Sequence, residues 1–388
     1  MNLFFVNPTE IQKPEIYGVA LHLPSDFKIT ILQPSDCSRI ERIKIRENIQ
    51  VTKMPSKFLT VCQSKITVSP LNLWVNELSN AIKSGQCDII HVCNYDYITA
   101  FPPIFVKKKF SVPIIVTNDA LMGTGSYSFG APLVDTVLGV YTHLVGKHVL
   151  KSYDKVVLLY SQLSKSAKSL GVAGEKLEII PNGIDVQLLT SCEKKLDVEK
   201  IKEKYGIESE EKVVLYVGRL VKMKRVEIVI AIVKKLLSQG LKVKALIVGD
   251  GPQKEKLEKL SNDLNGNIIF TGFLGDEKYE CFKIADLFVL PSLSEGLPTV
   301  LLEAAAFGVP MVAPNINGIG DVVIHGKTGF LVEKQRLFQY VNFAYLILTN
   351  DEFSRNMGLT ARNHVRKYFS WSVVALRYES VYRSLLKS

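Results

Sequence analysis

The sequence predicts an α/β protein made of two doubly wound parallel-sheet domains, and three observations support this. The chain has 388 residues, which exceeds one ordinary domain of roughly 100 to 200 residues. Short β-branched runs alternate with helical segments, a pattern typical of a parallel sheet covered by helices on both faces. The alternation restarts in the second half, and 47% of the residues are apolar. Two separate cores are therefore expected.

Each half contributes its own set of expected strands. In the first half they lie at 2–6, 27–32, 88–92, 113–117 and 155–159, and in the second at 212–216, 243–248, 267–271, 287–290, 310–313 and 330–332. The stretch 191–211 is rich in lysine and glutamate, so we place the boundary near Thr190, between domains 1–190 and 191–369. In 370–388, apolar residues spaced by threes and fours predict a C-terminal helix that packs back across the domains.

Composition narrows the class of protein. No apolar run approaches the roughly 20 residues that span a bilayer, and no signal peptide is evident. The six cysteines form no CxxC pair and the six histidines no HxxxH pair, which favours a reducing, cytoplasmic setting and no metal cofactor. The net charge of +10 suits anionic lipid or phosphorylated ligands. Nucleic acid is disfavoured because aromatic residues do not interleave with the basic ones.

The segment from Ser294 to Glu303 follows an expected strand and opens a helix. Pro298 suits the first helical position, which places Glu295 in the loop and Glu303 inside the helix. The free backbone N–H groups at the start of a helix form an anion site suited to a diphosphate. The stretch that would supply this site comprises Gly296, Leu297, Pro298, Thr299 and Val300. A polar loop followed by an exposed helix is the simpler alternative.

Two further segments follow strands of the same expected sheet. Gly218 and Arg219 follow the strand at 212–216, with Lys224 five residues beyond Arg219, so that both cations can converge on one diphosphate. Gly249 and Gly251 end the strand at 243–248 and leave room for a ligand to approach the backbone. A solvated basic turn and an ordinary glycine turn are the alternatives. The carboxyl ends of parallel strands are where such folds bind ligands.

Together these segments resemble the retaining glycosyltransferases of family 4, also called glycosyl transferases group 1. That family has the GT-B fold of two facing Rossmann-like domains and carries two glutamates separated by seven residues. The resemblance extends from Pro113 to the end of the chain. Its matching stretches are IIPNGID, YVGRLVKMK, IVGDGP, FTGFL, ADLFVLPSLSEGLPTVLLEAAAFGVPMVA and GKTGFLV.

The resemblance implies transfer of a hexosyl unit from a UDP- or GDP-sugar to a glycan or lipid-linked acceptor, without metal. It implies that Arg219 and Lys224 hold the donor diphosphate, that Glu303 binds the ribose and that Glu295 contacts the donor sugar. Preorganised cations and amides would stabilise the departing nucleoside diphosphate. A nucleotide-sugar epimerase of the same fold and an inactive sugar-nucleotide-binding subunit stay open as alternatives.

The N-terminal half departs from the family in two places. Members carry two adjacent glycines in the first loop, whereas the expected loop 7–19 offers only Gly18. Members also place a histidine six residues after the proline that opens the fourth strand, and here that position is Asp119. An ionised Asp119 would favour developing oxocarbenium charge and act in catalysis. The alternative is that Asp119 caps the turn before Gly123.

The expected helix from Pro132 to Leu150 has apolar residues on one side and His143, Lys147, His148 and Lys151 towards its end. Core packing is its ordinary explanation, and peripheral contact with an anionic membrane is the alternative. A dehydrogenase is disfavoured because Gly123-Thr124-Gly125 lacks the third glycine of a dinucleotide site. A metal-dependent transferase is disfavoured because no DxD occurs.

Overall fold

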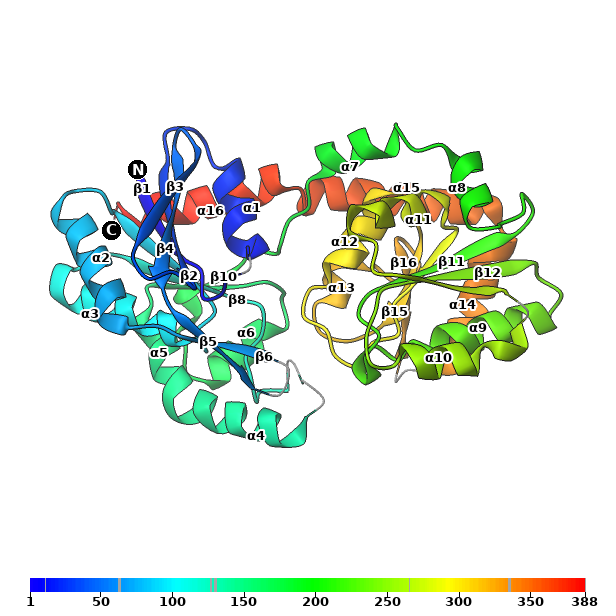
Figure 1. The fold of residues 1–388 in the computed structure, drawn as a ribbon, viewed down its shortest axis with the longest axis horizontal. Coiled ribbons are helices and arrows are strands. Elements are labelled where there is room, and N and C mark those ends of the chain that lie inside the picture. The colour runs from blue at the N-terminus through cyan, green and yellow to red at the C-terminus, as the bar shows by residue number, and fades with distance from the viewer. Residues whose placement is uncertain are drawn as a thin grey trace. The chain divides into compact units, whose positions relative to one another are not determined.

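The computed structural model describes residues 1–10, 12–61, 64–125, 128, 131–264, 266–333 and 336–387. Its contacts divide the chain into two compact units, Met1–Gly183 with Trp371–Ser388 and Ile184–Ser370 (Figure 1). The chain thus divides after Gly183, whereas the sequence suggested a boundary near Thr190. The difference arises because α7 (Val186–Glu193) packs on α11 (Lys278–Ile284) and α12 (Thr299–Ala306) of the C-terminal unit.

The N-terminal unit is built on an eight-stranded sheet in the order β10-β9-β8-β7-β1-β2-β4-β3. Neighbouring strands are parallel except for the antiparallel edge pair β3 and β4. A separate antiparallel hairpin is formed by β5 and β6. The strands are β1 Asn2–Val6, β2 Lys28–Ser35, β3 Glu41–Arg46, β4 Ile49–Pro55, β5 Lys57–Val61, β6 Ser64–Val68, β7 Ile89–Cys93, β8 Ile114–Asn118, β9 Lys155–Leu158 and β10 Leu177–Ile179.

Helices cover this sheet. They are α1 Pro14–His22, α2 Leu71–Lys83, α3 Phe101–Phe110, α4 Pro132–Tyr141, α5 Lys147–Ser152, α6 Leu163–Ser169 and α16 Trp371–Leu385, with a π-helical turn at Thr142–Gly146 between α4 and α5. The C-terminal helix α16 packs against α1, and both share a core with alternate residues of β1 and β2, such as Leu3, Phe5, Ile29 and Ile31. Of the apolar positions expected to form one face of this helix, Trp371, Val374, Tyr378 and Tyr382 are buried, and Leu385 is partly buried.

The C-terminal unit is built on a six-stranded sheet in the order β13-β12-β11-β14-β15-β16, parallel throughout (Figure 1). Its strands are β11 Lys212–Val217, β12 Val243–Val248, β13 Ile268–Gly272, β14 Leu287–Val289, β15 Met311–Pro314 and β16 Gly329–Val332. Its other helices are α8 Val198–Lys204, α9 Glu227–Ser238, α10 Lys254–Leu260, α13 Ile319–Val322, α14 Leu337–Thr349 and α15 Asp351–Tyr368. Each strand expected in this half is present.

The stretch 191–211, expected as a linker, contains the end of α7 and the whole of α8. Asp185 caps α7 by accepting a hydrogen bond from the Leu188 N–H, and Asp197 caps α8. Within the described ranges, none of the helices combines the length and apolar character needed to cross a membrane.

Candidate functional site

Two loops of the C-terminal unit meet at the carboxyl ends of β11 and β14. The Leu293 N–H donates a hydrogen bond to the Met223 carbonyl at 2.8 Å, which joins the loops through their backbones. Lys224 Nζ then lies 2.5 Å from Glu295 Oε1. Glu295 is buried and Lys224 is half-buried, so water screens this ion pair only weakly. The structure therefore brings together two of the residues singled out from the sequence.

Arg219 belongs to the same neighbourhood. The Tyr216 hydroxyl donates a hydrogen bond to the Arg219 carbonyl at 3.1 Å, which holds the turn after β11. Burial raises the pKa of Tyr216, and the negative charge of Glu295 raises it further. The positive charge of Arg219 acts in the opposite direction and lowers this pKa. Both charges thus act on one buried phenol, while the Arg219 side chain is exposed. Arg219 is available to an anionic ligand.

Asn317 is a residue of this site that the sequence reasoning missed. It follows β15, has a left-handed backbone with φ of 43°, and its amide nitrogen donates to the Glu295 carbonyl at 2.7 Å. The conformation is one that asparagine tolerates better than most residues. An Asn-Gly pair after an expected strand was the available signal.

The helix α12 begins one residue later than expected, because Pro298 is its N-cap and Thr299 its first residue. Pro298 has no side chain able to cap the helix, and no side-chain cap hydrogen bond is made. The first N–H groups of α12, beginning at Thr299 and Val300, are therefore not engaged by a capping side chain. This is the arrangement that favours an anion at a helix N-terminus.

Glu303 lies inside α12 and is buried. Its Oε1 accepts a hydrogen bond from Lys278 Nζ at 2.7 Å, whereas its Oε2 is buried with no hydrogen-bond partner among the described residues. Burial raises the pKa of Glu303, and Lys278 works against that rise. A buried carboxylate oxygen without a partner is costly unless a ligand supplies a donor. Lys278, at the start of α11, was not singled out from the sequence because its pairing depends on how α11 and α12 are placed.

Gly249 and Gly251 bring two loops together. A Cβ built on Gly249 would lie 1.9 Å from the Gly218 carbonyl oxygen, and one on Gly251 would lie 2.6 Å from the Leu220 carbonyl oxygen. The space that a side chain would need at these two positions is filled by protein backbone. Close packing of the loops accounts for both glycines without a ligand.

A second cluster lies at the carboxyl ends of β7 and β8 in the N-terminal unit. Asp119 directly follows β8, and its N–H donates to the Asn94 side-chain oxygen at 3.3 Å. Burial raises the pKa of Asp96 to about 7, and the charge of Asp119 adds to this rise. Burial lowers the pKa of Lys13, but nearby acidic groups, Cys93 first and then Asp119 and Glu15, outweigh burial and raise this pKa. Asp119 therefore sits among charged groups.

The first loop is shorter than expected. Its second half is the helix α1, which begins at Pro14, so Gly18 is a helical residue and not part of the loop. A Cβ on Gly18 would lie 2.2 Å from the Trp371 ring. Gly18 is thus required for packing against α16.

Core packing is the wrong explanation for most apolar residues of the expected helix. Leu133, Val137 and Val140 of α4 and Leu144 and Val145 of the π-helical turn are exposed. Tyr141, by contrast, is half-buried and stacks on Tyr95. The interior side of this helix is formed by other residues.

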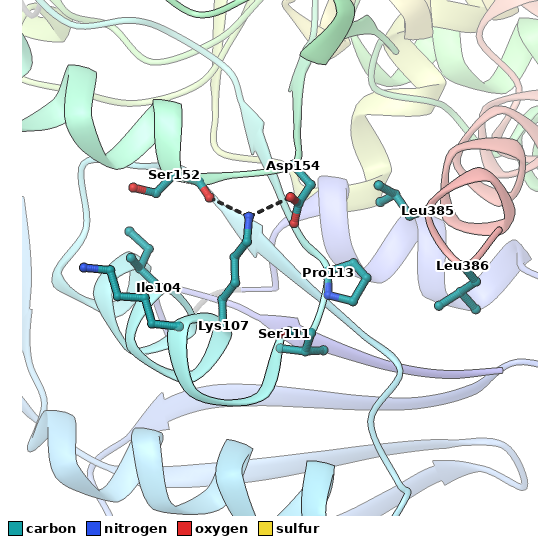
Figure 2. A pocket seen from close by; sticks show the side chains of 10 residues that line it. Ile104, Lys107, Ser111, Pro113, Ser152, Asp154, Leu385 and Leu386 are labelled. Atoms are coloured by element: carbon teal, nitrogen blue, oxygen red, sulfur yellow. Dashed lines mark hydrogen bonds and ion pairs between the residues drawn. The ribbon is translucent and has the colours of Figure 1, made fainter. Parts of the chain in front are cut away.

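A hollow in the N-terminal unit lies away from these clusters (Figure 2). Its lining includes Pro113 and Asp154, which precede β8 and β9 and so mark the amino ends of the strands. Lys107 Nζ points across it to Asp154 Oδ1 at 2.6 Å and to the Ser152 carbonyl at 2.9 Å. Ligands of doubly wound sheets bind at the opposite, carboxyl ends.

Comparison with known proteins identifies the class. Residues 17–188 match the family model described as Glycosyltransferase Family 4, and residues 197–364 match that of Glycosyl transferases group 1. The N-acetyl-alpha-D-glucosaminyl L-malate synthase of Bacillus anthracis is 30% identical over 80% of this chain and 78% of its own. The alpha-D-kanosaminyltransferase of Streptomyces kanamyceticus is 30% identical over 81% of each chain.

Solved structures share the fold. Sucrose-phosphate synthase from Thermosynechococcus elongatus has a TM-score of 0.76 at 20% identity, covering 100% of this chain and 99% of its own. HepE of Anabaena, solved with UDP-glucose, has a TM-score of 0.71 at 16% identity, covering 99% and 100%. The fold and the sequence matches define a glycosyltransferase with two α/β units. The chain belongs to glycosyltransferase family 4, the glycosyl transferases group 1.

Proposed function

We propose that this enzyme is a retaining transferase that moves a hexosyl unit from a UDP- or GDP-sugar to a glycan or lipid-linked acceptor. The observation that carries the proposal is Glu303, which has one oxygen held by Lys278 and the other buried without a partner in the described chain. A ribose diol would supply the missing donor. Such a site rejects ligands that lack the hydroxyl, because the buried oxygen then stays unpaired.

The remaining residues fit the other parts of a nucleotide sugar. Lys224 and the exposed Arg219 would bind the diphosphate together with the N–H groups at the start of α12. As the glycosidic bond breaks, negative charge develops on the departing diphosphate, and these fixed positive groups would stabilise it. Glu295, held beside Lys224, would contact the sugar.

The relatives support this assignment. HepE was solved in complex with UDP-glucose, and the Bacillus relative is named for an N-acetylglucosaminyl product.

Five of the cysteines are free thiols in the structure, and three of these are buried. Free thiols suit a reducing compartment, so we place the reaction in the cytoplasm.

The test is a screen of the purified enzyme with radiolabelled UDP- and GDP-sugars, in which hydrolysis of the donor is measured without an acceptor. We expect one donor to be hydrolysed, and we expect the rate to survive EDTA because protein cations take the place of a metal. A loss of more than about tenfold in EDTA, equal to about 1.4 kcal/mol of barrier and restored by magnesium or manganese, would contradict metal independence.

Two other outcomes would replace the proposal. Conversion of the donor to an epimer, followed by NMR of the sugar, would identify an epimerase. Tight binding of a nucleotide sugar with neither hydrolysis nor transfer to glycan acceptors would identify a non-catalytic binding subunit.

A further inference from the structure

The helix α4 and the π-helical turn after it present large apolar side chains to solvent. Leu133 is 78% exposed, Val137 59%, Val140 53% and Leu144 64%. Their spacing of four, three and four residues keeps them on one side of the helix. Single exposed apolar residues are ordinary on a protein surface, but a contiguous stripe of four marks an interaction surface.

The opposite side of this helix is made of small residues packed closely on the N-terminal unit. Gly139 approaches Gly123 so closely that a Cβ on Gly123 would lie 2.1 Å from the Gly139 Cα. Thr142 shares a 2.6 Å hydrogen bond with the Tyr95 hydroxyl, and a Cβ on Gly146 would lie 2.5 Å from the Tyr95 ring. The usual pattern of a surface helix is thereby reversed, with small residues inside and large apolar residues outside.

Basic side chains follow the stripe along the chain. His143, Lys147, His148 and Lys151 follow along the same helical segment, and Asp135 is the only carboxylate in the sequence from 132 to 152. The Asp135 carboxylate accepts a hydrogen bond from the Ser128 hydroxyl at 2.7 Å. An apolar stripe that continues into basic residues is complementary to acyl chains beneath anionic headgroups.

We propose that this face docks on an anionic lipid surface, with the stripe of Leu133, Val137, Val140 and Leu144 inserted at the headgroup boundary and the basic residues beside it. A second copy of the chain is a poorer partner, because its matching face would bring the same lysines, Lys147 and Lys151, and few carboxylates to pair with them. The proposal goes beyond the sugar transfer and does not depend on it.

The direct test is cosedimentation of the full chain with vesicles of phosphatidylcholine containing about 30 mol% phosphatidylglycerol, compared with phosphatidylcholine alone. We expect binding to the anionic vesicles that weakens as salt rises from 0.1 M towards about 0.5 M, because salt screens the basic residues. Replacing Leu133→Ser together with Leu144→Ser should lower partitioning at least about tenfold.

A matched control is Leu359→Ser together with Leu376→Ser, two exposed leucines on α15 and α16. This control should bind as the unaltered protein does. For the charges, Lys147→Glu with Lys151→Glu should lower binding to anionic vesicles more than about tenfold, whereas Lys235→Glu with Lys256→Glu should leave it unchanged. Thermal unfolding of all four variants establishes that each is folded.

The proposal is overturned if the protein does not bind anionic vesicles, or if the stripe variant and its control bind equally. It is also overturned if the stripe variant instead abolishes self-association in sedimentation equilibrium, since the face would then be an interface between copies. Donor hydrolysis without vesicles should be equal in all of these variants, which separates failure of this proposal from failure of the proposed function.

Discussion

At the scale of single residues, the candidate donor site contains two carboxylates that each engage a lysine from another segment of the chain. Lys224 pairs with Glu295, and Lys278 pairs with Glu303. Buried carboxylates are retained only with such partners, because an isolated buried charge is costly. The two pairs nevertheless differ, since the second oxygen of Glu303 is buried without a partner in the described chain.

This difference predicts separate kinetic roles. Glu303→Ala should mainly raise the donor KM, by about tenfold to a hundredfold, because a charge-assisted hydrogen bond to the ribose contributes about 1.5 to 3 kcal/mol. Glu295→Ala should mainly lower kcat. Lys278→Met, which leaves Glu303 in place but removes its anchor, should raise KM less than Glu303→Ala does. A severe loss of kcat with unchanged KM in Glu303→Ala would refute the ribose assignment.

In the N-terminal unit, the candidate catalytic residue to test is Asp119. If it orients or stabilises the reacting sugar, Asp119→Asn should lower kcat/KM by about ten- to a hundredfold, as expected for a lost hydrogen bond to a charged group. The substitution should also lower the pKa of Asp96 from about 7, because the charge of Asp119 contributes to that rise.

The measurement is kcat/KM as a function of pH from 6 to 8 for the unaltered enzyme and the variant. Near-normal kinetics with unchanged thermal stability would show that Asp119 serves only the turn after β8.

Part of this candidate site could be predicted from the sequence. The rest could not, because it depends on contacts between segments that are distant in the sequence. Lys224 and Glu295 were predicted because both follow strands of one parallel sheet, whose carboxyl ends share an edge. Lys278 and Asn317 were missed because their roles depend on contacts between separate segments. Gly249 was found by its motif, yet the structure shows backbone packing where we had expected room for a ligand.

At the scale of elements, parallel strands were easier to predict than antiparallel ones. The buried strands of the C-terminal sheet have continuous apolar runs, typical of a sheet covered on both faces. The edge strand β3 is exposed along its whole length and rich in charge, so its sequence carries no burial signal. The prediction that the apolar side of α4 packs in the core failed for a related reason. Periodicity shows that a helix has an apolar side but does not show whether that side faces the core.

The contact between α1 and α16 depends on a glycine. Gly18→Ala places a methyl group where the Trp371 ring lies, so we expect a destabilisation of about 1 to 3 kcal/mol, as for other overpacked cores. Gly174→Ala is the matched control in the same unit, since its Cβ would meet nothing closer than 3.8 Å and its backbone is not left-handed. The measurement is thermal unfolding, and equal midpoints for the two variants would contradict the packing argument.

At the scale of the whole molecule, two units of comparable size should unfold in separate steps, so a single free energy of unfolding does not describe the chain. Both tryptophans, Trp74 and Trp371, are buried in the N-terminal unit. Tryptophan fluorescence therefore reports on that unit alone, although the unit is assembled from both ends of the chain. The sequence predicted two domains. The return of the C-terminal segment to the N-terminal unit was predicted only from the apolar spacing of α16.

The closure of the N-terminal unit by α16 predicts a pH dependence that originates at one histidine. His91 on β7 is fully buried, with Nδ1 2.7 Å from the Tyr382 hydroxyl of α16 and Nε2 2.7 Å from the Thr117 hydroxyl. Burial lowers its pKa from 6.5 to about 3. The folded state therefore keeps His91 neutral, whereas the unfolded state gains a proton below pH 6.5.

It follows that the stability contributed by the neutral imidazole is complete above pH 6.5 and falls as the pH drops towards 3, by up to about 1.4 kcal/mol per pH unit. His91→Gln removes this titration while keeping a polar partner for Tyr382. The unfolding free energies of the two proteins, followed by tryptophan fluorescence in denaturant, should thus approach each other by about 2 kcal/mol between pH 6.5 and 5.

Carboxyls whose pKa is raised by burial, such as Glu15 and Asp96, change the stability with pH in the opposite direction. They are common to both proteins, so their effect cancels in the difference. Parallel stability curves over this range would mean that His91 takes up protons equally in the folded and unfolded states, which would contradict the burial argument.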